Sequence, residues 1–170
     1  MSIGLLIIRL VVGLTLAAHG SQKLFGWLGG GGISGTAPFM EQLGFRPARL
    51  QAALAGIAEV GGGLLLAVGL WTPMAGAVLV SVMLVAAVSV HWKNGFFLTA
   101  GGIEYTLVLA AAAAGLAFTG PGALSADGAL GLSWSGASAV AALAVGITAG
   151  AIQLLMRHRP PVEVAQRQPA

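Results

Sequence analysis

Long apolar stretches constrain the fold of this chain more than any other sequence feature. A helix needs about 20 mainly apolar residues to cross the hydrocarbon core of a membrane. Five stretches meet this requirement, from about Ile3 to Gly20, Leu50 to Leu70, Pro73 to Trp92, Leu98 to Phe118, and Trp134 to Met156. Only 8% of the residues are charged, whereas a soluble domain usually carries about 25%. The sequence therefore predicts an all-α integral membrane protein.

The connection between the first two spans is too polar and too rich in glycine to cross a membrane. Its glycine run at residues 29–32 predicts a flexible loop. The residues from Ala37 to Leu43 predict a short helix at the membrane surface, capped by Thr36 and ended by Gly44.

The remaining connections are short or rich in helix breakers. Residues 71–73, Trp-Thr-Pro, predict a tight turn at a membrane face. Residues 121–132 contain proline, glycine and the lone Asp127, and predict a surface loop. The polar tail, residues 157–170, predicts disorder.

The basic residues outside the spans all fall on one side of a five-span arrangement. They are Lys23, Arg46, Arg49, Lys93, Arg157, Arg159 and Arg167. Because cytoplasmic loops are enriched in lysine and arginine, this distribution predicts an N-terminus outside and a C-terminus in the cytoplasm. A cleaved signal peptide is the weaker interpretation of the first span, since no basic residue precedes the apolar run and Arg9 interrupts it.

Three charged residues, Arg9, Glu59 and Glu104, lie deep within the expected spans. Each costs about 2.5–3.5 kcal/mol at the centre of a membrane helix, so each needs a partner or a hydrated cavity. Counted from the cytoplasmic ends at 1.5 Å per residue, Arg9 and Glu59 both lie about 15–18 Å deep, and Glu104 about 10 Å. We therefore expect Arg9 and Glu59 to form an ion pair inside the bundle.

Other polar residues near the cytoplasmic ends extend these charges into a candidate cluster. The candidate ligand-binding or proton-relay residues are Arg9, His19, Lys23, Glu59, His91, Glu104 and Tyr105. We expect the two glutamates and His19 and His91 to line a cavity open towards the cytoplasmic half. The cluster has two interpretations: an ion pair that fixes helix register, or a site that binds a polar headgroup or relays protons.

Several chemistries are disfavoured by the sequence. The absence of cysteine excludes disulfides, thiolate metal ligands and cysteine nucleophiles. No histidine or glutamate pair has the helical spacing of di-iron or zinc sites, so no metal site is predicted. Asp127 is the only aspartate and falls in an expected loop, so a Ser-His-Asp triad lacks support. The glycine run is not a phosphate-binding fingerprint.

A series of short motifs lies in order along the first three quarters of the chain. They are residues 9–13 (RLVVG), 19–26 (HGSQKLFG), 55–63 (AGIAEVGGG), 69–73 (GLWTP), 91–97 (HWKNGFF), 102–105 (GIEY) and 120–122 (GPG). In these motifs the chain resembles the DoxX family of small bacterial membrane proteins. The resemblance implies a four-helix transmembrane bundle over residues 1–122 in the bacterial plasma membrane. Residues 123–156 would then add an outer loop and a fifth transmembrane helix, and residues 157–170 a cytoplasmic tail.

The resemblance leaves two hypotheses about function. The related DoxD subunit belongs to thiosulfate:quinone oxidoreductase, which implies a redox-linked membrane protein that binds a quinone-type headgroup at the Arg/Glu/His cluster. Since no haem, flavin or iron–sulfur pattern is visible, quinone is the one cofactor suggested. The alternative is a non-catalytic scaffold that anchors soluble oxidant-defence or sulfur-metabolism enzymes, or a small-solute carrier. Either protein would work in the lipid bilayer, as a monomer or a homo-oligomer, without nucleic acid.

Overall fold

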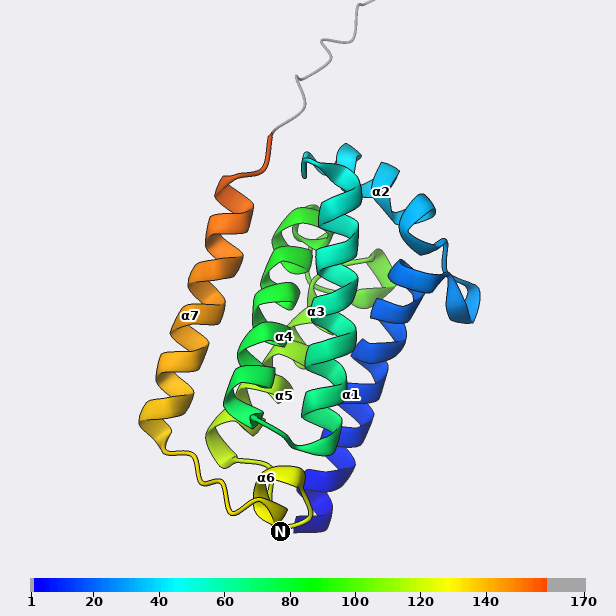
Figure 1. The fold of residues 1–170 in the computed structure, drawn as a ribbon. Helices are drawn as coiled ribbons and strands as arrows, with labels where there is room; N and C mark the ends of the chain where they lie inside the picture. The colour runs from blue at the N-terminus through cyan, green and yellow to red at the C-terminus, as the bar shows by residue number, and fades with distance from the viewer. Residues whose placement is uncertain (1, 159–170) are drawn as a thin grey trace, which may run out of the picture.

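The chain folds into a bundle of roughly aligned helices, and the computed structural model describes residues 2–158. The helices at the five expected spans are α1 (Ser2–Phe25), α3 (Ala48–Val68), α4 (Thr72–Ala86), α5 (Glu104–Thr119) and α7 (Gly136–Leu155). Of these, α1, α3, α7 and α4 with its continuation to Asn94 are long and apolar enough to cross a membrane. Figure 1 shows α7 along one edge and α1 along the other. The expected all-α membrane fold is confirmed.

Helix α5 is shorter than the expected fourth span. It begins at Glu104 instead of Leu98, and its 16 residues extend about 24 Å. The preceding segment folds back on itself through 3₁₀ turns at Trp92–Asn94 and Leu98–Ala100. The amide of Glu104 donates to the Phe96 carbonyl at 2.9 Å and closes this turn. The expected start at Leu98 is therefore wrong, because backbone bonds within the turn replace those of a continuous helix.

The helical path of α4 continues beyond its last α-helical residue, Ala86. A π-helical segment, Ala87–His91, continues it towards the 3₁₀ turn. The hydroxyl of Ser89 donates to the Val85 carbonyl at 2.6 Å across the junction. Single π turns within α-helices are frequent at functional sites.

The expected surface helix is present as α2, Gly32–Gln42, and begins earlier than predicted. Thr36 lies inside this helix, where its hydroxyl donates to the Gly32 carbonyl at 2.8 Å, and does not cap it. The glycine run before it is an ordered turn that follows the 3₁₀ turn Trp27–Gly29. A Cβ at Gly30 would lie 2.4 Å from the Gln22 carbonyl oxygen, so the turn packs directly on the backbone of α1.

The expected surface loop at residues 121–132 contains a short helix, α6 (Ala126–Ala129), so this expectation is corrected in part. Of the expected tail, Arg157 and His158 are described, and the amide of His158 donates to the Gly44 carbonyl at 2.9 Å. The rest of the tail lies outside the described residues, so its expected disorder stays a prediction. Figure 1 places α6 at the end opposite α2. We refer to these ends as the α6 end and the basic end, the latter carrying Lys23, Arg46, Lys93 and Arg157.

Glycines bring α1 and α3 into backbone contact. A Cβ at Gly13 would lie 2.5 Å from the Gly63 carbonyl oxygen, and one at Gly20 would lie 2.6 Å from that of Gly56. Small residues permit such close approach between membrane helices. The two contacts fix the antiparallel register of the pair, and they place Glu59 beside the Gly20 region of α1.

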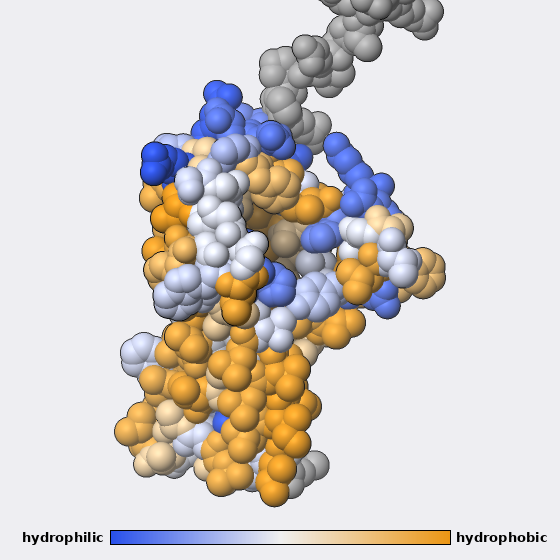
Figure 2. All heavy atoms as spheres, turned by 90° about the vertical axis from the view of Figure 1, so that its right-hand side faces the viewer, coloured by the Kyte–Doolittle hydropathy of each residue, from blue (hydrophilic) through white to orange (hydrophobic). Residues whose placement is uncertain are grey.

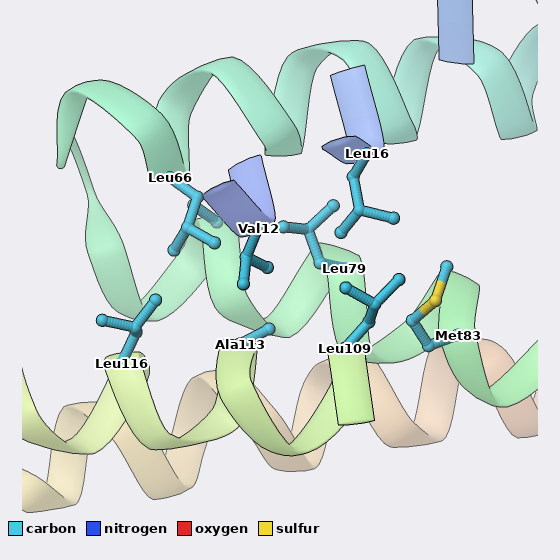
Figure 3. Packing of buried hydrophobic residues seen from close by; sticks show 9 residues of the cluster. Val12, Leu16, Leu66, Leu79, Met83, Leu109, Ala113 and Leu116 are labelled. Carbon is cyan, nitrogen blue, oxygen red and sulfur yellow. The ribbon is translucent and has the colours of Figure 1, made fainter. Parts of the chain in front are cut away.

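Helix α4 is the centre of the bundle, because it packs against α3, α5 and α7. Figure 3 shows the core, in which Leu16 of α1, Leu66 of α3 and Leu79 of α4 meet residues of α5 such as Ala113. The outer surface is also apolar. Figure 2 shows one face with a continuous hydrophobic lower part, while hydrophilic side chains gather around a hollow at the upper, basic end. This pattern fits a protein embedded in a lipid bilayer.

Candidate functional site

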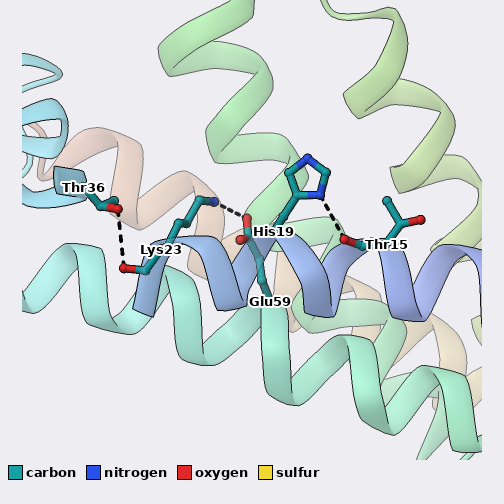
Figure 4. A network of polar contacts seen from close by, with 5 residues as sticks. All are labelled: Thr15, His19, Lys23, Thr36 and Glu59. Atoms are coloured by element: carbon teal, nitrogen blue, oxygen red, sulfur yellow. Dashed lines mark hydrogen bonds and ion pairs between the residues drawn. The ribbon is translucent and has the colours of Figure 1, made fainter. Parts of the chain in front are cut away.

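An ion pair between Lys23 and Glu59 joins α1 and α3 near the basic end. Figure 4 shows the Lys23 ammonium at the Glu59 carboxylate, where Nζ donates a hydrogen bond to Oε1. The Glu59 side chain is 2% exposed and that of Lys23 is 29% exposed. The second oxygen, Oε2, is buried and has no hydrogen-bond partner within residues 2–158. A carboxylate buried in this way depends on its single cation.

Lys23 also forms part of the wall of a cavity of about 310 Å³. Helices α2, α3, α4 and α7 and the π-helical segment supply most of the other wall residues. The polar wall residues are Lys23, Gln51, Ser81, Ser89 and Gln153. All the other wall residues are apolar, as is typical of sites that bind small lipophilic molecules through a few placed polar groups.

The two glutamines on the cavity wall are hydrogen-bonded to each other. Nε2 of Gln153 on α7 donates to Oε1 of Gln51 on α3 at 2.5 Å. The hydroxyl of Ser89 is occupied by the Val85 carbonyl as a donor, but its oxygen can still accept a hydrogen bond. The Lys23 ammonium has three donors, of which the Glu59 contact uses one. The polar side chains of the cavity wall can therefore donate to an acceptor such as a carbonyl oxygen.

His19 and Tyr105 lie near this ion pair but do not line the cavity. His19 is exposed, and its Nδ1 contacts the Thr15 carbonyl oxygen of its own helix at 2.9 Å. Its ring lies 6.0 Å from that of Tyr105, centre to centre, in a tilted arrangement. This contact joins α1 to the start of α5.

His91 and Glu104 hold the folded segment before α5. Nδ1 of His91 contacts the Gly101 carbonyl oxygen at 2.7 Å, and Oε2 of Glu104 accepts from the Leu98 amide at 2.8 Å. Neither residue lines the cavity. These bonds stabilise the turn that replaced the expected start of the fourth span.

Arg9 lies at the α6 end, remote from Glu59. Its Nη2 donates to the Leu124 carbonyl oxygen at 2.6 Å, and its Nη1 donates to that of Pro121. A Cβ at Gly69 would lie 2.4 Å from Nη1, so the guanidinium is level with the end of α3. Gly69 and Glu59 are ten residues apart along the chain, or about 15 Å along a helix axis. The expected Arg9–Glu59 pair is therefore wrong.

Asp127 is a buried charge that the sequence interpretation placed on the surface. It is fully buried, and its carboxylate accepts from the amides of Trp71 and Thr72 at 2.8 and 3.1 Å, at the start of α4. The Thr72 hydroxyl and the Trp134 indole also donate to it, at 2.8 and 2.9 Å. Burial by itself raises the pKa of this carboxyl, but the four hydrogen bonds outweigh burial and hold the pKa below its usual value.

The expected cluster is thus divided among separate places. Lys23 and Glu59 meet at the cavity, His91 and Glu104 hold a turn, His19 contacts Tyr105, and Arg9 secures the opposite end. The cavity lies towards the basic end, and of the seven candidates only Lys23 lines it, so the expectation that the two glutamates, His19 and His91 line it does not hold for this cavity. In the part of the chain that the structure describes, no group of three or more His, Asp or Glu residues could hold a metal ion.

Comparison with known proteins gives one match. The model of the DoxX family matches residues 4–92, which is 89 of the 170 residues and includes α1, α2, α3 and α4. The matched region contains Lys23, Glu59 and most of the cavity wall. No curated protein and no solved structure matches the chain.

Proposed function

Since the chain belongs to the DoxX family and is a multi-pass membrane protein, we propose that it binds a lipophilic molecule with an uncharged, quinone-type headgroup. The cavity beside Lys23 carries this proposal. It combines mainly apolar walls with a few polar side chains, among them the Lys23 ammonium of the ion pair. This combination suits a ring that carries carbonyl oxygens on an otherwise apolar frame.

The ion pair favours an uncharged headgroup over an anion. Glu59 neutralises the Lys23 ammonium, so the pair offers hydrogen bonds without a net positive charge. An anionic headgroup entering the cavity would compete with the buried carboxylate for the same cation. A carbonyl oxygen can accept one of the remaining Lys23 donors and leave the ion pair intact.

We also propose that the basic end faces the cytoplasm and that the protein lies in a bacterial plasma membrane. The basic residues that mark this end support the orientation. Alkaline phosphatase fused after Leu70, at the α6 end, should be active in the periplasm, and a fusion after Leu155 should be inactive. The opposite activities would reverse the proposed orientation.

The binding proposal is tested by thermal unfolding of the purified protein with a tail-less dimethoxy-methyl-benzoquinone. A ligand that binds only the folded state raises its stability by mass action, so the melting temperature of the wild type should rise with concentration. Ala55→Phe fills the cavity and should abolish the rise, because Ala55 lies on the cavity wall. Ile57→Phe is the matched control, since Ile57 is an exposed residue of the same helix and does not line the cavity.

Equal shifts in both variants would place the ligand elsewhere on the protein or in the detergent. No shift in any of the proteins would contradict quinone-type binding and favour the scaffold hypothesis. In that case the folded basic end, and not the cavity, would be the surface to examine for protein partners.

A further inference from the structure

A second apolar hollow continues the cavity along the bundle. It has a volume of about 530 Å³ and lies between α7 and α4, with Ala58 of α3 at its border. Four residues line both hollows: Ala58, Ser81, Val82 and Ala149. The two volumes therefore meet at a shared wall near the middle of α4. Away from this junction, Ser138 is the only polar side chain on the wall.

Small residues of α7 create this hollow, which we call the α4–α7 groove. Gly146 lies directly against α4, since a Cβ there would be 2.4 Å from the Ala77 carbonyl oxygen. Ala141, Ala142 and Val145 leave the space beside this contact unfilled. The groove reaches from Ala149 to Ser138, or about 16 Å along the helix axis.

We infer that the α4–α7 groove holds the hydrocarbon tail of the same molecule whose headgroup occupies the cavity. This inference rests on the proposed function and specifies the ligand as a long-tailed amphiphile. The argument is adjacency: the cavity and the groove share four wall residues, so a chain attached to a ring in the cavity has only this shared border to pass before it reaches the groove. Apart from Ser81 and Ser138 the groove is lined by apolar residues, so an alkyl or isoprenoid chain matches it and a polar solute does not.

The inference also gives α7 a role in binding. This helix lies outside the region that the family model matches, yet it supplies Ala149 and Gln153 to the cavity and one whole wall to the groove. A ligand tail would enter from the bilayer along α7. The helix therefore belongs to the binding site and is more than an additional membrane anchor.

The test compares one headgroup with and without a tail. The dissociation constants of the tail-less benzoquinone and of its decyl derivative are measured in the full-length protein and in two α7 variants. Ala141→Phe fills the groove, whereas Ala144→Phe adds the same ring at an exposed position outside both hollows. The decyl tail partitions into detergent equally in both experiments, so a difference in dissociation constant between Ala141→Phe and Ala144→Phe reports on the groove alone.

The decyl derivative should bind Ala144→Phe at least about tenfold more tightly than it binds Ala141→Phe. The tail-less ring should bind both variants equally. If the decyl derivative also binds both equally, the headgroup site stands and the tail groove is refuted. If neither compound binds the wild type, the proposed function fails and this inference fails with it.

Discussion

The loss of stability on breaking the Lys23–Glu59 pair should depend strongly on which partner is removed. Lys23→Met leaves a carboxylate that is 2% exposed and already has one oxygen without a hydrogen bond within residues 2–158. Glu59→Gln leaves an ammonium that is 29% exposed and can reach water. The first change should therefore destabilise the fold far more than the second.

Breaking a buried ion pair costs about 3–5 kcal/mol when the remaining charge stays ionised. We expect Lys23→Met to lower the free energy of unfolding by about 3 kcal/mol at pH 7. Glu59→Gln should lower it by about 1 kcal/mol.

Unfolding of the detergent-solubilised variants at pH 7 measures these losses. The double variant should be more stable at pH 7 than Lys23→Met alone, because the stranded charge is gone. Lys93→Met is the matched control, since Lys93 is exposed and forms no ion pair in the described part of the chain. Equal and additive losses from the two single changes would refute the buried ion pair.

Two further predictions concern helix packing and the α6 end. Gly63→Ala places a Cβ 2.5 Å from the Gly13 carbonyl oxygen and should lower the free energy of unfolding by about 1–3 kcal/mol. A Cβ at Gly61 meets nothing within 4 Å, so Gly61→Ala should leave the stability unchanged. Equal shifts in melting temperature for the two variants would contradict the close packing of α1 and α3. The pKa of Asp127 is lowered on folding from 3.8, so its contribution is present above about pH 4 and is lost as the pH falls. Asp127→Asn should therefore lower the melting temperature at pH 7, and the deficit should shrink under acid; an unchanged deficit at about pH 3 would contradict this.

The sequence predicted the spans well because their signal is local. Apolar length and glycine punctuation lie within each segment, so α3, α7 and α4 with its π-helical continuation lie close to their expected bounds. Depth within the membrane was predicted poorly. The first span was expected to end at Gly20, but α1 continues to Phe25, and this extension moved Arg9 away from Glu59.

The correct partner of Glu59 had a signal in the sequence that the depth estimate missed. Gly13 and Gly20 are seven residues apart, and so are Gly56 and Gly63. Antiparallel alignment of these two pairs places Glu59 level with Ala17, about 9 Å along the axis from Lys23 and about 12 Å from Arg9. No comparable signal marked Asp127, because its partners Trp71 and Thr72 lie 56 and 55 residues away in the chain.

The π-helical segment of α4 keeps the side of this helix that lines the cavity straight. On this helix the cavity is bordered by residues four apart, Ser81, Val85 and Ser89 in one row and Val82, Ala86 and Val90 in the next. In an α-helix each step of four residues rotates a row by about 40° around the axis. The wider π turn winds the backbone more slowly and counteracts this rotation at Ser89 and Val90. If Ala87–His91 were one residue shorter, these two rows of side chains would rotate away from the cavity. The cavity wall would then twist before it reached the end of the bundle.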